Sequence, residues 1–276
     1  MISDITLGQF FPGESLLNKA DPRTKILSAI LFMTTIFCAQ NLFSYLLLIG
    51  VTLSLAIIGN IRIRLLWKSI RPLLIVLLIT GLLNLFLTKG EGDPLVSLGF
   101  LVIYEEGIWR ALFMAIRVVL LVSGASLLLT YTTSPIQLTD GLESLLSPFK
   151  KLHLPVHEFA MMMTIALRFI PTLIEETDKI MKAQKARGAD FSTGGLLQRA
   201  KALLPVLIPL FVASFQHAMD LATAMECRCY HGGEGRTKYR VLKFQCRDAL
   251  FLLTLLVVLG AVICMNRFLP IGQVMA

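Results

Sequence analysis

Two arginines stand at the ends of two long helical patterns in the second half of the chain. Arg187 and Arg228 lie 41 positions apart (187 to 228), and the same offset places Ala183 on Ala224 and Lys185 on Glu226. A guanidinium in the last turn of a helix is favoured by the helix dipole, and its planar fork can bind a carboxylate through two parallel hydrogen bonds. A single arginine of this kind is common at helix C-termini. Its repetition favours two docking points for a partner.

The candidate docking residues are the arginines and their immediate neighbours. They are Ala186, Arg187, Gly188, Glu226, Cys227, Arg228 and Cys229. Gly188 is suited to a left-handed helix cap, whereas the second arginine has thiol residues on both sides, which leaves the cap geometry at that end open.

The elements that must position these residues are two helices over residues 156–187 and 196–228. Each would be about 50 Å long at 1.5 Å per residue. Pro171 in the first helix, and Pro205 and Pro209 in the second, predict kinks because proline cannot donate a backbone hydrogen bond.

The composition indicates a membrane protein. Hydrophobic residues make up 55% of the chain and charged residues only 16%, outside the range of soluble domains. The net charge of +8 does not favour nucleic-acid binding here, because lysine and arginine gather on the cytoplasmic side of membrane proteins. The first 25 residues lack the pattern of a cleaved signal peptide.

Five membrane spans are predicted. Residues 26–61 carry no charge and are too long for one crossing, so we expect two short antiparallel spans broken at Gln40-Asn41, with a single tilted helix as the alternative. The other three predicted spans cover residues 73–88, 109–130 and 249–265.

The segments between the spans carry predictions of their own. The basic residues from Arg62 to Arg71 are expected to form a linker, and residues 95–104 are too short to cross, which suggests a re-entrant or surface segment. Ser134-Pro135 is expected to open an amphipathic helix. Arg117, at membrane depth, should be satisfied by backbone carbonyls, reach the interface, or contact a partner.

The distribution of basic residues predicts which side each segment occupies. If residues 132–247 stay in the cytoplasm, 22 of the 26 lysines and arginines lie on that side. The sequence therefore predicts an all-α membrane protein with about five spans, a cytoplasmic N-terminus and an external C-terminus. The expected domains are 1–131 with the first four spans, 132–247 as a cytoplasmic coupling domain of amphipathic helices, and 248–276 with the last span.

No enzyme site or cofactor site competes with this interpretation. The four histidines have no zinc-protease spacing, and the glycine-rich residues 232–238 lack the ending of a phosphate-binding loop, so we expect no ATPase in this chain. Cys227, Cys229 and His231 have zinc-ligand chemistry, but their spacing is tight and no second ligand pair follows. We therefore expect no metal and no catalytic residue.

The order of several short motifs resembles the transmembrane (T) component of energy-coupling factor transporters, the EcfT/CbiQ family. The motifs are Asp21-Pro-Arg-Thr-Lys25, Glu105-Glu-Gly107, Thr132-Thr-Ser-Pro135, Arg168-Phe-Ile-Pro171 and Ala183-Gln-Lys-Ala-Arg-Gly188. Family members carry two Ala-Arg-Gly-like motifs on coupling helices that insert into grooves of two ATPase subunits. The resemblance implies that Arg187 and Arg228 have this role. The second motif departs from the pattern, since Arg228 stands between two cysteines.

The resemblance also implies a function and partners. The chain would be a non-catalytic subunit of an importer for a vitamin or metal ion in the bacterial cell membrane, and would pass the motion of two ATP-binding subunits to a separate substrate-binding S component. The alternative is a stand-alone secondary transporter that binds its own solute, which requires convergent polar groups at the membrane midplane. In the predicted spans, Arg117 alone meets that requirement.

Overall fold

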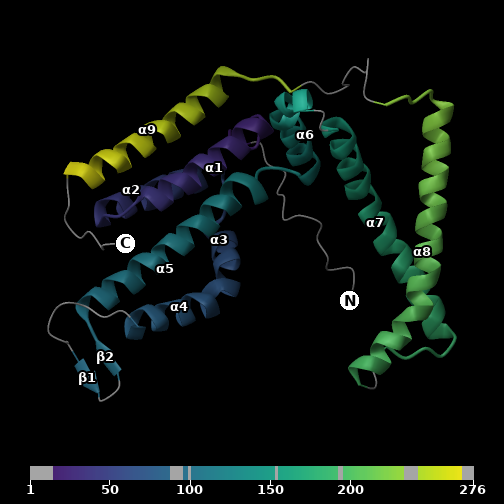
Figure 1. Ribbon diagram of the computed structural model, residues 1–276, viewed down its shortest axis with the longest axis horizontal. Helices are drawn as coiled ribbons and strands as arrows, with labels where there is room; N and C mark the ends of the chain where they lie inside the picture. The colour runs from purple at the N-terminus through teal and green to yellow at the C-terminus, as the bar shows by residue number, and fades with distance from the viewer. Residues whose placement is uncertain are drawn as a thin grey trace. The chain divides into compact units, whose positions relative to one another are not determined.

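The computed structural model divides the chain into two compact units (Figure 1). One contains Met1–Leu7 and Leu142–Val241, and the other contains Gly8–Gly141 and Leu242–Ala276. The residues that the structure describes are 15–87, 96–98, 101–152, 155–191, 195–232 and 242–268.

The unit that contains the N-terminal helices is built around apolar helices. Its elements are α1 (Pro22–Cys38), α2 (Leu42–Ile58), α3 (Ile63–Ile70), a 3₁₀ turn (Arg71–Leu73), α4 (Leu74–Leu87), β1 (Val96–Leu98), β2 (Leu101–Ile103), α5 (Glu105–Ala125), a π-helical turn (Ser126–Thr130) and α9 (Cys246–Phe268). Helix α6 (Pro135–Leu146) begins in this unit and crosses into the other.

The first apolar stretch forms two helices, as predicted. Helix α1 ends at Cys38 and α2 begins at Leu42, so the chain turns at the polar pair Gln40-Asn41. Asp21 caps α1, since its carboxylate accepts a hydrogen bond from the Arg23 N–H at 2.9 Å. Each helix has 17 residues, at the lower limit for a span.

The structure defines the conformation of two connecting segments. The basic stretch from Arg62 to Arg71, predicted as a linker, is largely helical, since it contains α3 and a 3₁₀ turn that lead into α4. In the other segment, Val96–Leu98 and Leu101–Ile103 are paired antiparallel strands, with Val96 opposite Ile103. Cross-strand pairing satisfies backbone groups in a run too short to cross, and the prediction of a re-entrant or surface segment stays a prediction.

Arg117 is satisfied by backbone and side-chain groups inside its own unit. Its Nε donates to the Tyr45 hydroxyl at 3.0 Å and its Nη2 donates to the Ala39 carbonyl at 3.3 Å. Ala39 follows the last residue of α1, where carbonyls lack helical partners and a cation is favoured. The structural role, one of the readings open from the sequence, is therefore the one observed.

A close contact between α1 and α5 is permitted by a glycine. A Cβ built on Gly124 would lie 2.3 Å from a ring carbon of Phe32, which is 1% exposed. The surrounding core includes Ile36, Leu48 and Leu127, so the ring has little room to move.

Gly124→Ala is expected to lower the free energy of unfolding by about 1–3 kcal/mol, because the added methyl overpacks the contact with Phe32. Thermal unfolding of the detergent-solubilised chain measures the change. Gly260→Ala in α9 is the matched control: a Cβ there meets nothing within 4 Å, and alanine favours the helix. Equal melting temperatures for the two variants would contradict the role of the contact.

Helix α9 runs parallel to α1 and is fastened to it at both ends. Near its start, Asp248 Oδ1 accepts from the Asp21 N–H at 3.0 Å, and near its end Asn266 Nδ2 donates to the Cys38 carbonyl at 2.6 Å. Figure 1 shows α9 lying alongside α1 and α2. The α1 start is also held by Lys25, whose Nζ donates to the Thr132 carbonyl at 2.8 Å.

Thr132 and Asp248 consequently lie at the same end of this unit, although residues 142–241 separate them in sequence. An odd number of membrane crossings between these two residues would bring the chain back at the opposite end. The structure is thus incompatible with α8 crossing the membrane alone: either both long helices of the other unit cross or neither does.

The other unit contains the end of α6, a 3₁₀ segment (Ser147–Leu152), α7 (Val156–Ala186) and α8 (Leu196–Cys227). Helix α6 begins at Pro135, as predicted, with reciprocal bonds between Ser134 and Gln137. Both long helices continue through their prolines. Figure 1 shows α8 changing direction along its first half, which contains Pro205 and Pro209.

The chain is an all-α membrane protein apart from the small hairpin. Among the described residues, five helical segments are long and apolar enough to cross a membrane: Ile63–Phe86, Gly107–Thr130, Val156–Ala186, Leu197–Cys227 and Cys246–Phe268. Three of them coincide with predicted spans, and Leu42–Ile58 is a shorter apolar helix. The two in the middle are α7 and α8, which the basic residues predict to be cytoplasmic.

Candidate functional site

Helix α7 carries the first candidate tip. Glu158 lies in its first turn and Lys185 in its last, so both charges interact favourably with the helix dipole. Ala186 is the last helical residue and Arg187 is the C-cap. The side chains of both residues are exposed.

The end of α7 is a Schellman motif. The Gly188 N–H donates to the Lys185 carbonyl at 3.0 Å, and the Ala189 N–H donates to the Gln184 carbonyl at 3.0 Å. Gly188 has φ +88, a left-handed conformation that glycine adopts without a steric penalty. The cap stops the helix at a defined residue, so Arg187 stands at its tip.

The end of α8 has the same motif. The Cys229 N–H donates to the Glu226 carbonyl at 2.9 Å, and the Tyr230 N–H donates to the Met225 carbonyl at 3.1 Å. Cys229 takes the position of Gly188 and has φ +57. The sequence left this cap open because thiol residues flank Arg228, whereas the fold places Arg228 at a C-cap equivalent to that of Arg187.

Cys229→Gly is expected to stabilise the last turn of α8 by about 0.5–1 kcal/mol, because glycine removes the penalty of a left-handed Cβ. Hydrogen exchange of the amides in that turn measures the gain as slower exchange. The control is Cys227→Gly, two residues earlier within the helix, which should make exchange faster. Faster exchange in both variants would rule out the strained cap.

Both tips present charge to the surroundings. Arg187, Arg228, Glu226, Cys227 and Cys229 are all exposed. Neither guanidinium has an ion-pair partner within the described parts of the chain. The two tips differ two residues before the arginine, where Lys185 in α7 corresponds to Glu226 in α8. Each tip can therefore offer a fork of hydrogen-bond donors to a carboxylate, in a different local charge environment.

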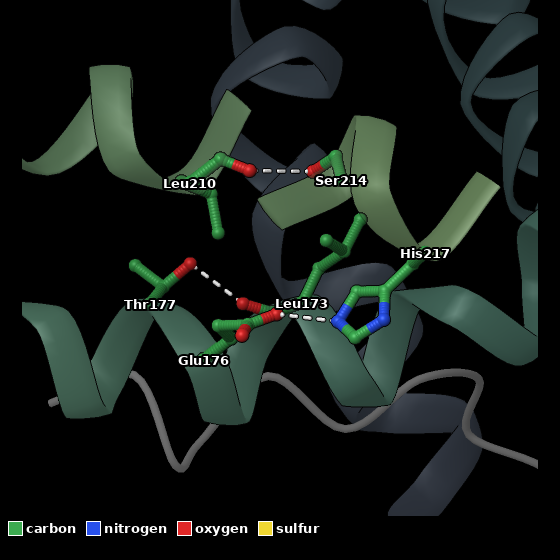
Figure 2. A network of polar contacts seen from close by, with 6 residues as sticks. All are labelled: Leu173, Glu176, Thr177, Leu210, Ser214 and His217. Atoms are coloured by element: carbon green, nitrogen blue, oxygen red, sulfur yellow. Dashed lines mark hydrogen bonds and ion pairs between the residues drawn. The ribbon is translucent and has the colours of Figure 1, made fainter. Parts of the chain in front are cut away.

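The two helices meet at a polar contact that the sequence analysis missed. Figure 2 shows Glu176 of α7 facing His217 of α8, with Glu176 Oε2 3.0 Å from His217 Nε2. The carboxylate can only accept, so the imidazole nitrogen donates. The Phe169 ring lies 6.2 Å from the imidazole, centroid to centroid. Both residues of the pair are partly exposed, with side-chain exposures of 38% for the histidine and 29% for the glutamate.

A signal for this contact was present in the sequence. Glu176 and His217 are 41 positions apart, the same offset that relates Arg187 to Arg228. The spacing of the two arginines does not predict where the two helices touch. The shared offset of Glu176 and His217 is therefore recognisable only once their contact is known.

The described residues contain no group of three or more His, Cys, Asp or Glu side chains that could hold a metal ion. Cys227 and Cys229 are free and exposed thiols. The exposed guanidiniums of Arg187 and Arg228 offer hydrogen bonding and positive charge at the two helix tips.

Comparison with known proteins gives consistent matches to a family model and to individual relatives. The model of the cobalt transport protein family, CbiQ, matches residues 13–239. A relative in Clostridium kluyveri, named energy-coupling factor transporter transmembrane protein EcfT, is 52% identical over 248 residues, which cover 90% of this chain and 92% of that protein. Relatives of the same name in Ruminiclostridium cellulolyticum and Bacillus subtilis are 53% identical over 91% of this chain and 46% identical over 93%.

Proposed function

Because this chain belongs to the EcfT/CbiQ family of transmembrane components of energy-coupling factor transporters, we propose that it couples two ATPase subunits to a separate substrate-binding subunit. The transported substrate would be a vitamin or a metal ion, and the complex would lie in the bacterial cell membrane. ATP hydrolysis takes place on the partner subunits, and this chain has no catalytic role.

The observation that carries the proposal is the duplicated helix end. Arg187 and Arg228 occupy the same position of the same cap on two long helices, and both are exposed. Two equivalent cationic tips suit two related partners. Docking would involve Ala186, Arg187, Gly188, Glu226, Cys227, Arg228 and Cys229.

The proposed domains separate the membrane spans from the helices that carry the two arginines. Residues 1–131 would hold four spans, 132–247 would form the cytoplasmic coupling domain, and 248–276 would add the last span, with the N-terminus inside. Two observations support keeping α7 and α8 out of the bilayer. A lone crossing by α8 is incompatible with the positions of Thr132 and Asp248, and a double crossing would carry the basic residues between the two helices to the outside.

The substrate-binding subunit would contact the apolar face of α8. Five large apolar side chains recur at steps of three or four along this helix, and each is at least half exposed. They are Leu204, Ile208, Phe211, Phe215 and Met219. A continuous exposed stripe of this kind is typical of a surface that packs on another helical protein or on lipid.

Co-purification distinguishes this function from a stand-alone transporter. The full chain, expressed with candidate ATPase subunits and solubilised in detergent, should retain two ATPases and a substrate-binding subunit. Reconstituted alone in liposomes, it should show no solute uptake. Uptake by the isolated chain, without ATPase capture, would overturn the proposal and favour a secondary transporter.

The orientation can be tested with the native thiols beside Arg228. In a chain with Cys38, Cys246 and Cys264 replaced by serine, a membrane-impermeant maleimide should not label Cys227 or Cys229 in intact cells, and should label them after permeabilisation. Labelling in intact cells would place this tip outside and contradict ATPase docking.

A further inference from the structure

The contact between α7 and α8 lies at equivalent positions of the two helices. Glu176 is 11 residues before Arg187 (176 to 187), and His217 is 11 residues before Arg228 (217 to 228). At 1.5 Å per residue, each arginine lies about 16 Å beyond the contact along its own helix. The helices therefore extend past their contact by equal lengths.

The two arms extend in opposite directions. Figure 1 shows the C-terminal ends of α7 and α8 on opposite sides of the region where the helices meet. Equal arms in opposite directions, each ending in the same cap, relate the tips by an approximate two-fold axis through the contact between Glu176 and His217. A partner that binds both tips must present two sites related in the same way.

The arms are also the uninterrupted parts of the two helices. Residues 177–186 and 218–227 contain no proline and no glycine, whereas Pro171, Pro205 and Pro209 all lie before the contact. A helix without these residues keeps its full set of backbone hydrogen bonds and resists bending. A displacement of a tip is thus transmitted along the arm to the contact between Glu176 and His217. Bending is concentrated in the proline-containing parts of the helices, before that contact.

We propose that Glu176 and His217 are positioning residues that form the pivot of this helix pair and fix the register in which the two arginines are presented to a two-fold-related pair of ATPase subunits. The identity of the partner rests on the proposed function, whereas the pivot itself rests on the contact. A pair this exposed contributes little to folding stability, so its main effect is to select one register among several that the apolar neighbours would permit.

An exchange of the two residues tests the pivot. Glu176→His alone places two imidazoles at the contact, and His217→Glu alone places two carboxylates there. The double variant Glu176→His/His217→Glu restores a mixed pair, because the two positions are equivalent. Glu175→His, at the exposed neighbouring position, is the matched control.

The readout is the distance distribution between spin labels at Ala183→Cys and Ala224→Cys, two exposed and equivalent positions near the tips. The full chain is used in nanodiscs, with Cys229 replaced by glycine and the other native cysteines by serine. The parent and the Glu175→His control should give one narrow distribution, each single variant a broad or shifted one, and the exchanged pair the narrow one again. A narrow, unshifted distribution in the single variants, or failure of the exchanged pair to restore it, would overturn the pivot.

ATPase binding by the same variants separates the pivot from the docking function. Loss of simultaneous engagement of the two tips should weaken ATPase capture about 10–100-fold in the single variants, with recovery in the exchanged pair. If the distance between the tips changes while ATPase capture does not, Glu176 and His217 do not position the arginines for ATPase binding. If capture is also insensitive to loss of both arginines, the docking function fails as well.

Discussion

Arg187→Ala and Arg228→Ala should each weaken the binding of ATPase subunits by about 2–5 kcal/mol, provided that the guanidinium is desolvated against a carboxylate in the complex. The loss is this large because the partner's carboxylate would remain buried without its counter-charge. Titration of purified ATPase subunits against the nanodisc-embedded chain measures it. The double variant should lose co-purification altogether.

Two control variants distinguish the paired hydrogen bonds of the guanidinium from the effect of a positive charge alone. Lys182→Ala removes an exposed cation one turn before the first tip and should have little effect on binding. Arg187→Lys keeps the charge and loses the two parallel hydrogen bonds, so we expect affinity between those of the parent and the alanine variant. Normal co-purification after removal of both arginines would contradict docking through the tips.

Lys25→Met should reduce the free energy of unfolding by about 3–5 kcal/mol, the range for removal of one member of a buried charged network. Lys25 is 0% exposed, and its Nζ donates to the carbonyls of Thr132 at 2.8 Å and Asn18 at 3.1 Å. The carboxylates of Asp248 and Asp21, both buried, act on the same charge. Without Lys25, two carbonyls lose a donor and two carboxylates lose their nearby counter-charge.

Thermal unfolding in detergent measures this loss, with Lys68→Met as the control, since Lys68 is exposed on α3. A further consequence concerns connectivity. Lys25 holds the chain at Thr132, before the unit that contains α7 and α8, and Asp248 holds it after that unit. Lys25→Met should therefore increase proteolysis near residues 132 and 248. Equal stability of the two methionine variants would contradict the structural role of Lys25.

Features set by local chemistry were predictable from the sequence. The turn at Gln40-Asn41 follows from a polar pair within an apolar run too long for one span. The start of α6 follows from serine and proline at its first positions, and Arg187 at a helix end follows from the glycine after it. These signals act over a few residues, and they also led to the family.

Features that depend on contacts between distant residues were missed or left open. The helical conformation of the basic segment before α4 and the pairing of Val96 with Ile103 were not predicted. The sequence also did not reveal that Lys25 bonds to Thr132, although both belong to motifs recognised in the chain. Composition and periodicity describe one element at a time and do not say which elements meet.

The sequence alone determined that this is a helical membrane protein of the transporter family and that it carries two arginines at a fixed spacing, because hydropathy, caps and charge are local properties. Tertiary structure decided that the second arginine has the same cap despite Cys229, that α7 and α8 meet through Glu176 and His217, and that α9 returns beside α1. Those results depend on which side chains fit together across the fold, since packing and hydrogen bonding join residues far apart in the chain.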